Sequence, residues 1–144
     1  MLSKKTQYAF KALIYLAEHS KNGPVLIADI SKKKRIPLKF LENILLELRK
    51  AGLLESKKGK GGGYYFAVPP KDIPLSKVMR LLDGPIALLS CVSLNFYEKC
   101  ADCDEATCGL YKAMAVTRDA TLKILEKKTL MELVDSNNNY IPPF

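Results

Sequence analysis

The sequence predicts a mainly α-helical protein that contains one small β-hairpin and ends in a long C-terminal helix. Apolar residues recur at helical spacing through the first 50 residues and again after residue 110. A glycine-rich, basic turn at 57–63 separates two short β-prone segments. No apolar run approaches the roughly 20 residues needed to cross a bilayer, which excludes a membrane-spanning protein.

Three helices are expected before the hairpin. Apolar residues recur every three to four positions over 4–19, and an Asn-Gly-Pro sequence at 22–24 ends this helix. A second helix of about eight residues follows. Ile36-Pro37 then breaks the chain, because proline lacks a backbone donor and disfavours helix in the residue before it. Pro37 opens the third helix, which has a clear 3.6-residue apolar face and runs to residue 51.

Residues 53–56 and 64–68 are the expected strands of the hairpin. Two helices separated by a tight turn, the second after a basic run, indicate a helix-turn-helix. Three helices followed by a hairpin with a basic tip describe a winged helix-turn-helix. A nucleotide-binding P-loop is only weakly supported, because the glycines at 59–63 lead into a strand and no Ser or Thr follows a lysine there.

The charge of the chain is divided unevenly. Residues 1–80 hold 17 Lys and Arg against 6 Asp and Glu, whereas residues 81–144 hold 6 against 9. A strongly basic front half attracts a polyanion, of which nucleic acid is the commonest. The chain starts at Met1 without an apolar signal core, so we expect a cytoplasmic protein.

All four cysteines lie within 18 residues: Cys91, Cys100, Cys103 and Cys108. In a reducing compartment such a group indicates a metal or redox site more than a disulfide framework. Zinc and an iron–sulfur cluster both accept thiolates, and the spacing leaves both open. Cys91 also lies among apolar neighbours, which suits a packed side chain. His19 is the only histidine, and no catalytic pairing is recognisable, so an enzyme is not expected.

A final helix is expected over 110–127, with a stripe of apolar and small residues. Because residues 1–80 are expected to complete the core of the winged helix, this stripe needs another partner, and a second copy of the chain is the simplest one. Asn137–Asn139 and Ile141–Phe144 resemble a frayed tail.

Four stretches of this sequence closely resemble the Rrf2 family of bacterial winged-helix transcriptional regulators, namely 40–45, 48–53, 58–64 and 81–85. The resemblance implies a homodimer joined through its C-terminal helices. It also implies that the third helix enters the major groove of double-stranded DNA and that the wing reaches the adjacent minor groove. Phe40 departs from the family, which often has tyrosine there. The candidate DNA-binding residues are Lys32, Lys33, Lys34, Arg35, Lys39, Asn43, Lys57, Lys58, Gly59, Lys60, Gly61 and Gly62.

Many members of this family bind an iron–sulfur cluster through three cysteines between a linker helix and the final helix. Cys108, followed by Gly109-Leu110-Tyr111, resembles the last of these three. Tyr111 and Gln7 stand where other members place a fourth ligand, and neither is a usual cluster ligand. The candidate metal ligands are therefore all four cysteines, and a two-iron or a four-iron cluster is compatible with them.

The sequence thus predicts a winged helix-turn-helix domain with its linker helix over 1–83, a cysteine-rich sensor loop over 84–109, and a dimerisation helix with a tail over 110–144. The expected function is a dimeric, sequence-specific transcriptional regulator, taken as a repressor, whose DNA affinity is switched by the cluster or by redox state. One alternative is a regulator of the CymR type, controlled by thiols alone or by a partner enzyme, with no cofactor in the purified protein. A less favoured alternative is a small iron–sulfur redox protein.

Overall fold

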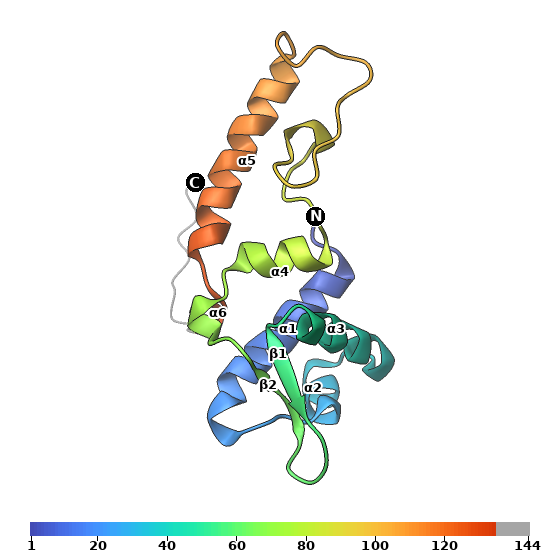
Figure 1. The fold of residues 1–144 in the computed structure, drawn as a ribbon, viewed down its shortest axis with the longest axis vertical. Helices are drawn as coiled ribbons and strands as arrows, with labels where there is room; N and C mark the ends of the chain where they lie inside the picture. The colour runs from blue at the N-terminus through green and yellow to red at the C-terminus, as the bar shows by residue number, and fades with distance from the viewer. Residues whose placement is uncertain (135–144) are drawn as a thin grey trace.

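The computed structural model describes residues 1–134, which form a helical domain with a two-stranded wing and a long helix rising from it (Figure 1). This architecture confirms the predicted fold class. No helix in these residues has both the length and the apolar character needed to cross a membrane. The predicted frayed segments, Asn137–Asn139 and Ile141–Phe144, lie outside the described residues. The helices and strands are α1 (Lys4–His19), α2 (Ile27–Lys34), α3 (Leu38–Lys50), β1 (Leu54–Lys57), β2 (Gly63–Phe66), α4 (Leu75–Leu82), α5 (Gly109–Lys127) and α6 (Leu130–Val134), with short 3₁₀ turns η1 (Ser20–Asn22), η2 (Pro70–Asp72) and η3 (Ser90–Val92).

Local chemistry sets the ends of the first three helices. Ser3 caps α1, because its hydroxyl accepts a hydrogen bond from the backbone N–H of Thr6 at 3.1 Å. Helix α2 ends at Arg35, which adopts a left-handed conformation with φ of 53°. Pro37 then precedes α3, as predicted. Each predicted helix boundary therefore lies within one or two residues of the observed one.

The wing is an antiparallel pair in which Leu54 faces Phe66 and Lys57 faces Gly63. Val25 joins it through an isolated bridge, exchanging two backbone hydrogen bonds of 2.9 and 2.8 Å with Tyr64. Gly63 permits this approach, because a Cβ atom there would lie 2.3 Å from the Val25 carbonyl oxygen. The wing is therefore attached to the segment before α2 as well as to α3.

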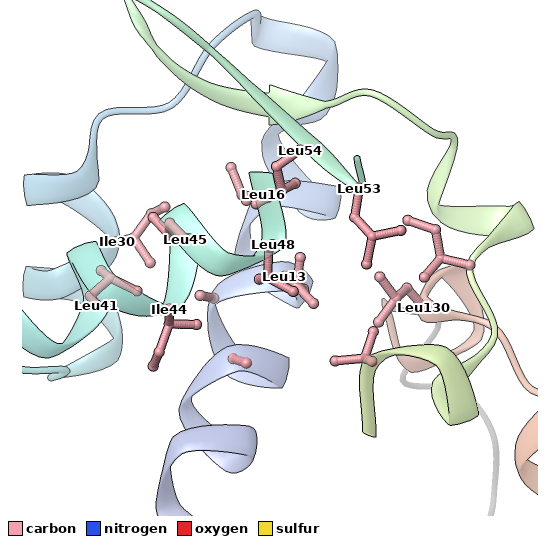
Figure 2. Close-up of a cluster of buried hydrophobic side chains, with 14 of the residues drawn as sticks. Leu13, Leu16, Ile30, Leu41, Ile44, Leu45, Leu48, Leu53, Leu54 and Leu130 are labelled. Atoms are coloured by element: carbon pink, nitrogen blue, oxygen red, sulfur yellow. The ribbon is translucent and has the colours of Figure 1, made fainter. Parts of the chain in front are cut away.

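The hydrophobic core lies between α1, α3 and the start of the wing, and it also includes α6 (Figure 2). Leu130 of α6 is completely buried, and its N–H donates to the Ile73 carbonyl at 3.0 Å. The N–H of Leu75 donates to the Lys128 carbonyl at 2.9 Å, which fixes α6 beside α4. The prediction that residues 1–80 complete the core is therefore wrong. A five-residue helix gives too short a pattern for the sequence to reveal its packing partner.

Helix α5 extends away from this core toward the cysteine loop (Figure 1). It contacts α4, where Arg80 forms an ion pair with Glu126 at 3.4 Å, and η3. Leu122 is its one buried residue. Leu110, Val116 and Ile124 are 58%, 70% and 56% exposed, so most of the apolar surface of α5 is uncovered in the single chain.

We expect Leu130→Ala to lower the free energy of unfolding by about 2–5 kcal/mol, the usual cost of a leucine-sized cavity in a core. The matched control is Leu46→Ala, since Leu46 is a leucine of α3 that is 38% exposed. Urea unfolding of both variants at one protein concentration measures the difference. Equal losses in the two variants would show that α6 does not contribute to the core.

Candidate functional site

One face of α3 is free of the core and carries polar side chains. Burial of Leu41, Ile44, Leu45 and Leu48 fixes the opposite face. Lys39, Asn43 and Lys50 are exposed, and their spacing of four and seven residues places them on one outward face. The Lys39 side chain is 90% exposed, with its ammonium 3.8 Å from the Glu42 carboxylate. Lys50 was not among the predicted residues, although the same helical spacing could have identified it.

Two side-chain contacts join α3 to α1 outside the hydrophobic core. The Lys5 ammonium lies 2.6 Å from the Glu47 carboxylate. The Tyr8 ring packs edge-on against Phe40, with 5.6 Å between ring centroids. Phe40 thus contributes an aromatic contact with α1 at the position where the family often has tyrosine. These two contacts and the packing of the core together set the orientation of α3 relative to α1.

In the basic run at the end of α2, three side chains are exposed to solvent and one packs against α1. Lys32, Lys33 and Arg35 are exposed. Lys34 differs, because its ammonium lies 5.8 Å from the centre of the Tyr15 ring on α1. The sole histidine, His19, stacks on the same tyrosine with ring centroids 4.1 Å apart, as an intramolecular contact of helix α1.

The wing tip presents lysines on a tightly folded glycine turn. Lys57, Lys58 and Lys60 are exposed, and within the described chain no carboxylate lies within 4.0 Å of their ammonium groups. Gly59 and Gly61, also exposed, have φ of 88° and 74°. Gly62 is buried, and a Cβ atom there would lie 2.2 Å from the Lys57 carbonyl oxygen. Gly62 therefore closes the turn, and its neighbours form the accessible tip.

The four cysteines border one cavity of about 350 Å³, at the opposite end of the molecule from the wing tip (Figure 1). Cys91, on η3, is 8% exposed, and Cys100, Cys103 and Cys108 are half-buried. A hydrogen bond with the Cys103 thiol is the main cause that lowers the pKa of Cys100. The same contact, with burial and the nearby Cys108, raises the pKa of Cys103 to about 12. Three of the thiols are thus immediate neighbours.

These thiols do not converge on one point. Within residues 1–134, no three His, Cys, Asp or Glu side chains are placed to hold a single metal ion. An iron–sulfur cluster consists of several atoms, so its thiolates stand further apart than the ligands of one ion. A cavity bordered by all four cysteines has the donor chemistry that such a cluster requires.

Hydrogen bonds within the cysteine loop, residues 84–108, use several of its polar groups. The Cys108 sulfur caps α5 by accepting the Tyr111 N–H at 3.4 Å. The Asp104 carboxylate accepts the N–H of Ala106 at 3.0 Å, and Tyr97 donates to Glu105. Arg118 of α5 donates to the Val92 carbonyl at 2.6 Å and thereby fixes η3 against α5.

A polar junction joins the start of α1 to the end of α4. The Ser3 N–H donates to one oxygen of Asp83 at 3.1 Å, and the Ser3 hydroxyl donates to the other. Burial opposes ionisation of this carboxyl, but the hydrogen bonds from Ser3 and Thr6 and the charge of Lys5 outweigh it and lower the pKa of Asp83. Ser3 could be recognised from the sequence as a helix cap, whereas its partner 80 residues away could not.

Comparison with known proteins places the whole described chain in one family. The Rrf2 family model, described as iron-dependent transcriptional regulator, matches residues 2–136. An rrf2-like HTH-type transcriptional regulator of Rhodobacter capsulatus is 38% identical over 142 residues, covering 96% of this chain and 95% of the relative. The HTH-type transcriptional regulator IscR of Vibrio atlanticus is 35% identical, over 94% of this chain and 76% of its own.

Solved structures agree with the sequence relatives. CymR, the global cysteine regulator of B. subtilis, superposes with a TM-score of 0.76 at 29% identity, over 93% of this chain and 95% of its own. IscR of T. potens superposes with a TM-score of 0.75 at 26% identity, over 100% of this chain and 93% of its own. The names of these relatives describe regulators of transcription rather than enzymes, as predicted. With its winged helix-turn-helix, its linker helix and its long final helix, this chain belongs to the Rrf2 family of transcriptional regulators.

Proposed function

We propose that this protein is a cytoplasmic, dimeric repressor whose affinity for specific DNA is switched by an iron–sulfur cluster held in the cysteine loop. The observation that carries the proposal is the placement of two distinct chemistries at opposite ends of one fold. Exposed lysines on α2, α3 and the wing form one end, and a cavity bordered by four cysteines forms the other. Helices α4 and α5 connect the two ends.

The DNA-binding half of the proposal assigns a separate task to each basic element. Lys39 and Asn43 face outward near the start of α3, which suits reading base edges in the major groove. The wing lysines and the basic run 32–35 supply charge for phosphate contacts that fix the register of the protein on the duplex. Phosphate neutralisation releases counterions, so binding should weaken steeply with salt.

Replacing the wing lysines should test this division. We expect the double variant Lys58→Ala and Lys60→Ala to bind specific and non-specific DNA more weakly by similar factors. The slope of log K against log salt concentration should become shallower by about 0.9 for each phosphate that the wing no longer neutralises. Fluorescence anisotropy over a series of salt concentrations measures both quantities.

The matched control replaces Lys71 and Lys77, two exposed lysines on η2 and α4, with alanine. The control removes the same charge from outside the proposed interface, so its salt slope should stay close to that of the wild type. Equal slopes for both double variants would refute the role of the wing.

Homodimerisation through α5 is proposed because this helix leaves apolar surface uncovered. The exposed Leu110 and Ile124 lie on one face of the helix, about four turns apart, and Val116 is exposed on a neighbouring face. Monomeric proteins rarely leave such surface in contact with water. A second copy would cover it and would place two winged domains at the fixed separation that two DNA half-sites require.

Cys91, Cys100, Cys103 and Cys108 would hold the cluster, since all four border the same cavity. When bound, the cluster would supply iron ligated by these thiolates, and the protein without it would have four free thiols. The protein contributes the walls of the cavity and the hydrogen bonds of Asp104, Tyr97 and Arg118 that hold the loop. Ligation would add covalent links between η3, the loop and the first turn of α5.

The alternative of control by thiols or by a partner enzyme has two observations in its favour. The Cys100 and Cys103 thiols are close enough for each to shift the pKa of the other, and the chain superposes on CymR, a cysteine regulator, with a TM-score of 0.76. The electron-carrier alternative has no comparable support and leaves the basic face of α3 without a role. Visible absorption of protein purified without oxygen, together with iron and sulfide analysis, separates a cluster from free thiols.

We expect Cys103→Ala or Cys108→Ala to abolish cofactor binding and to shift specific DNA affinity by about 1–3 kcal/mol, the usual size of allosteric coupling. Dimerisation should survive, because the exposed face of α5 is unchanged. Cys91→Ala should have the same effect if its thiolate is a ligand, and Cys91→Val, which keeps the apolar packing, should not restore the cofactor. Unchanged DNA affinity after verified loss of the cofactor would show that the cysteine site is structural and not a switch.

A further inference from the structure

We infer that Asp83 is a positioning residue that couples the cysteine loop to the recognition helix α3 through the first turn of α1. The inference rests on the proposed function and names the route by which the loop would act on DNA binding. Asp83 follows the last residue of α4 and precedes Gly84, where the loop begins. Its carboxylate accepts two hydrogen bonds from Ser3, the capping residue of α1, so the residue just before the loop contacts the start of α1 directly.

The loop reaches this junction through Phe96. Gly84 has φ of 89°, and a Cβ atom there would lie 3.8 Å from the Phe96 ring, so the ring lies against the backbone at this turn. Phe96 stands between Cys91 and Cys100 in the chain, and its N–H donates to the hydroxyl of the buried Ser93 at 3.1 Å. A rearrangement of the cysteines would thus reach the Phe96 ring, which lies against Gly84, the residue that follows Asp83.

The first turn of α1 depends on the same carboxylate. The Ser3 hydroxyl accepts the Thr6 N–H as a helix cap and donates its own proton to Asp83. One carboxylate thereby orients the cap, and it also accepts the Ser3 N–H. When Asp83 moves, Ser3 loses two acceptors and the cap loses its orientation, which weakens the first turn.

This first turn carries Lys5, whose ammonium lies 2.6 Å from Glu47 on α3. Glu47 lies one helical turn beyond Asn43, on the helix proposed to enter the major groove. Loosening the first turn releases an ion pair that fixes the flank of α3, while the core still holds its inner face. The expected result is a change in DNA affinity without unfolding.

The packing around the junction favours movement there. A cavity of about 560 Å³ lies between the start of α1, the loop and α5. Ser3 and Asp83 border it together with Ile86, Leu88, Arg118 and Thr121. This space is not filled by interlocking side chains, and the hydrogen bonds of Asp83 cross its edge, joining the start of α1 to the residue just before the loop.

The first experiment measures coupling as the ratio of specific DNA affinities with and without the reconstituted cluster. We expect a wild-type ratio of about 5- to 150-fold. Asp83→Asn keeps the shape of the side chain but loses the charge and one acceptor, and Ser3→Ala removes the hydroxyl while keeping the carboxylate. Both should bring the ratio close to one. Asp72→Asn, an exposed acid in η2, should keep the wild-type ratio. A wild-type ratio in both junction variants would overturn the inference.

The second experiment uses protein without a cofactor and measures hydrogen exchange at the amides of Thr6 and Gln7. Phe96→Ala, which removes the ring against Gly84, should accelerate their exchange by about five- to tenfold, the scale of losing a helix cap. Asp72→Asn should leave it unchanged. Unaltered exchange in Phe96→Ala would overturn the inference. If the DNA affinity of the wild type is the same with and without the cluster, the proposed switch is refuted. The second experiment would still decide whether the loop and α1 are coupled.

Discussion

Burial of one face of α1 is the constraint on which the rest of the structure depends. Ala9, Ala12, Leu13 and Leu16 are at most 1% exposed, and α1 contacts α2, α3, α4, α6 and β2. Two of these residues are alanines, so neighbouring helices can approach closely. A helix in contact with so many elements serves as a common reference for the wing and for α3, whose positions relative to each other decide whether both can contact one duplex.

The two ends of the molecule are held together by different forces. The DNA-binding end is built on interlocking leucines and isoleucines, which resist displacement because cores are close-packed (Figure 2). The cysteine end depends on hydrogen bonds such as Arg118 to Val92 and Tyr97 to Glu105, around open cavities. Segments with few buried apolar contacts open at low free-energy cost, which suits a sensor. The contrast places rigidity where DNA geometry demands it and adaptability where a cofactor would bind.

Acidic residues around the cysteines illustrate how local structure changes the meaning of a charge pattern. Glu98, Asp102, Asp104 and Glu105 surround the thiols in the sequence, and such charges disfavour a further anionic group. In the structure, Asp104 accepts a backbone hydrogen bond and Glu105 accepts the Tyr97 hydroxyl. Both carboxylates therefore take part in shaping the loop, and their charge is partly compensated by donors.

The sequence by itself determined α1, α2, α3, α5, the wing and the cysteine group, because each depends on neighbours a few residues apart. Periodicity identified α1 and α3, proline and glycine marked their ends, and the lysines of the wing tip followed from a glycine-rich turn. Tertiary structure alone decided that Leu130 completes the core, that Gly62 turns inward and that Asp83 caps the start of α1 through Ser3. These features join residues far apart in the chain or, at Gly62, depend on a backbone approach too close for a Cβ atom. No local pattern encodes them, since a leucine, a glycine or an aspartate has the same sequence signature whichever distant partner it meets.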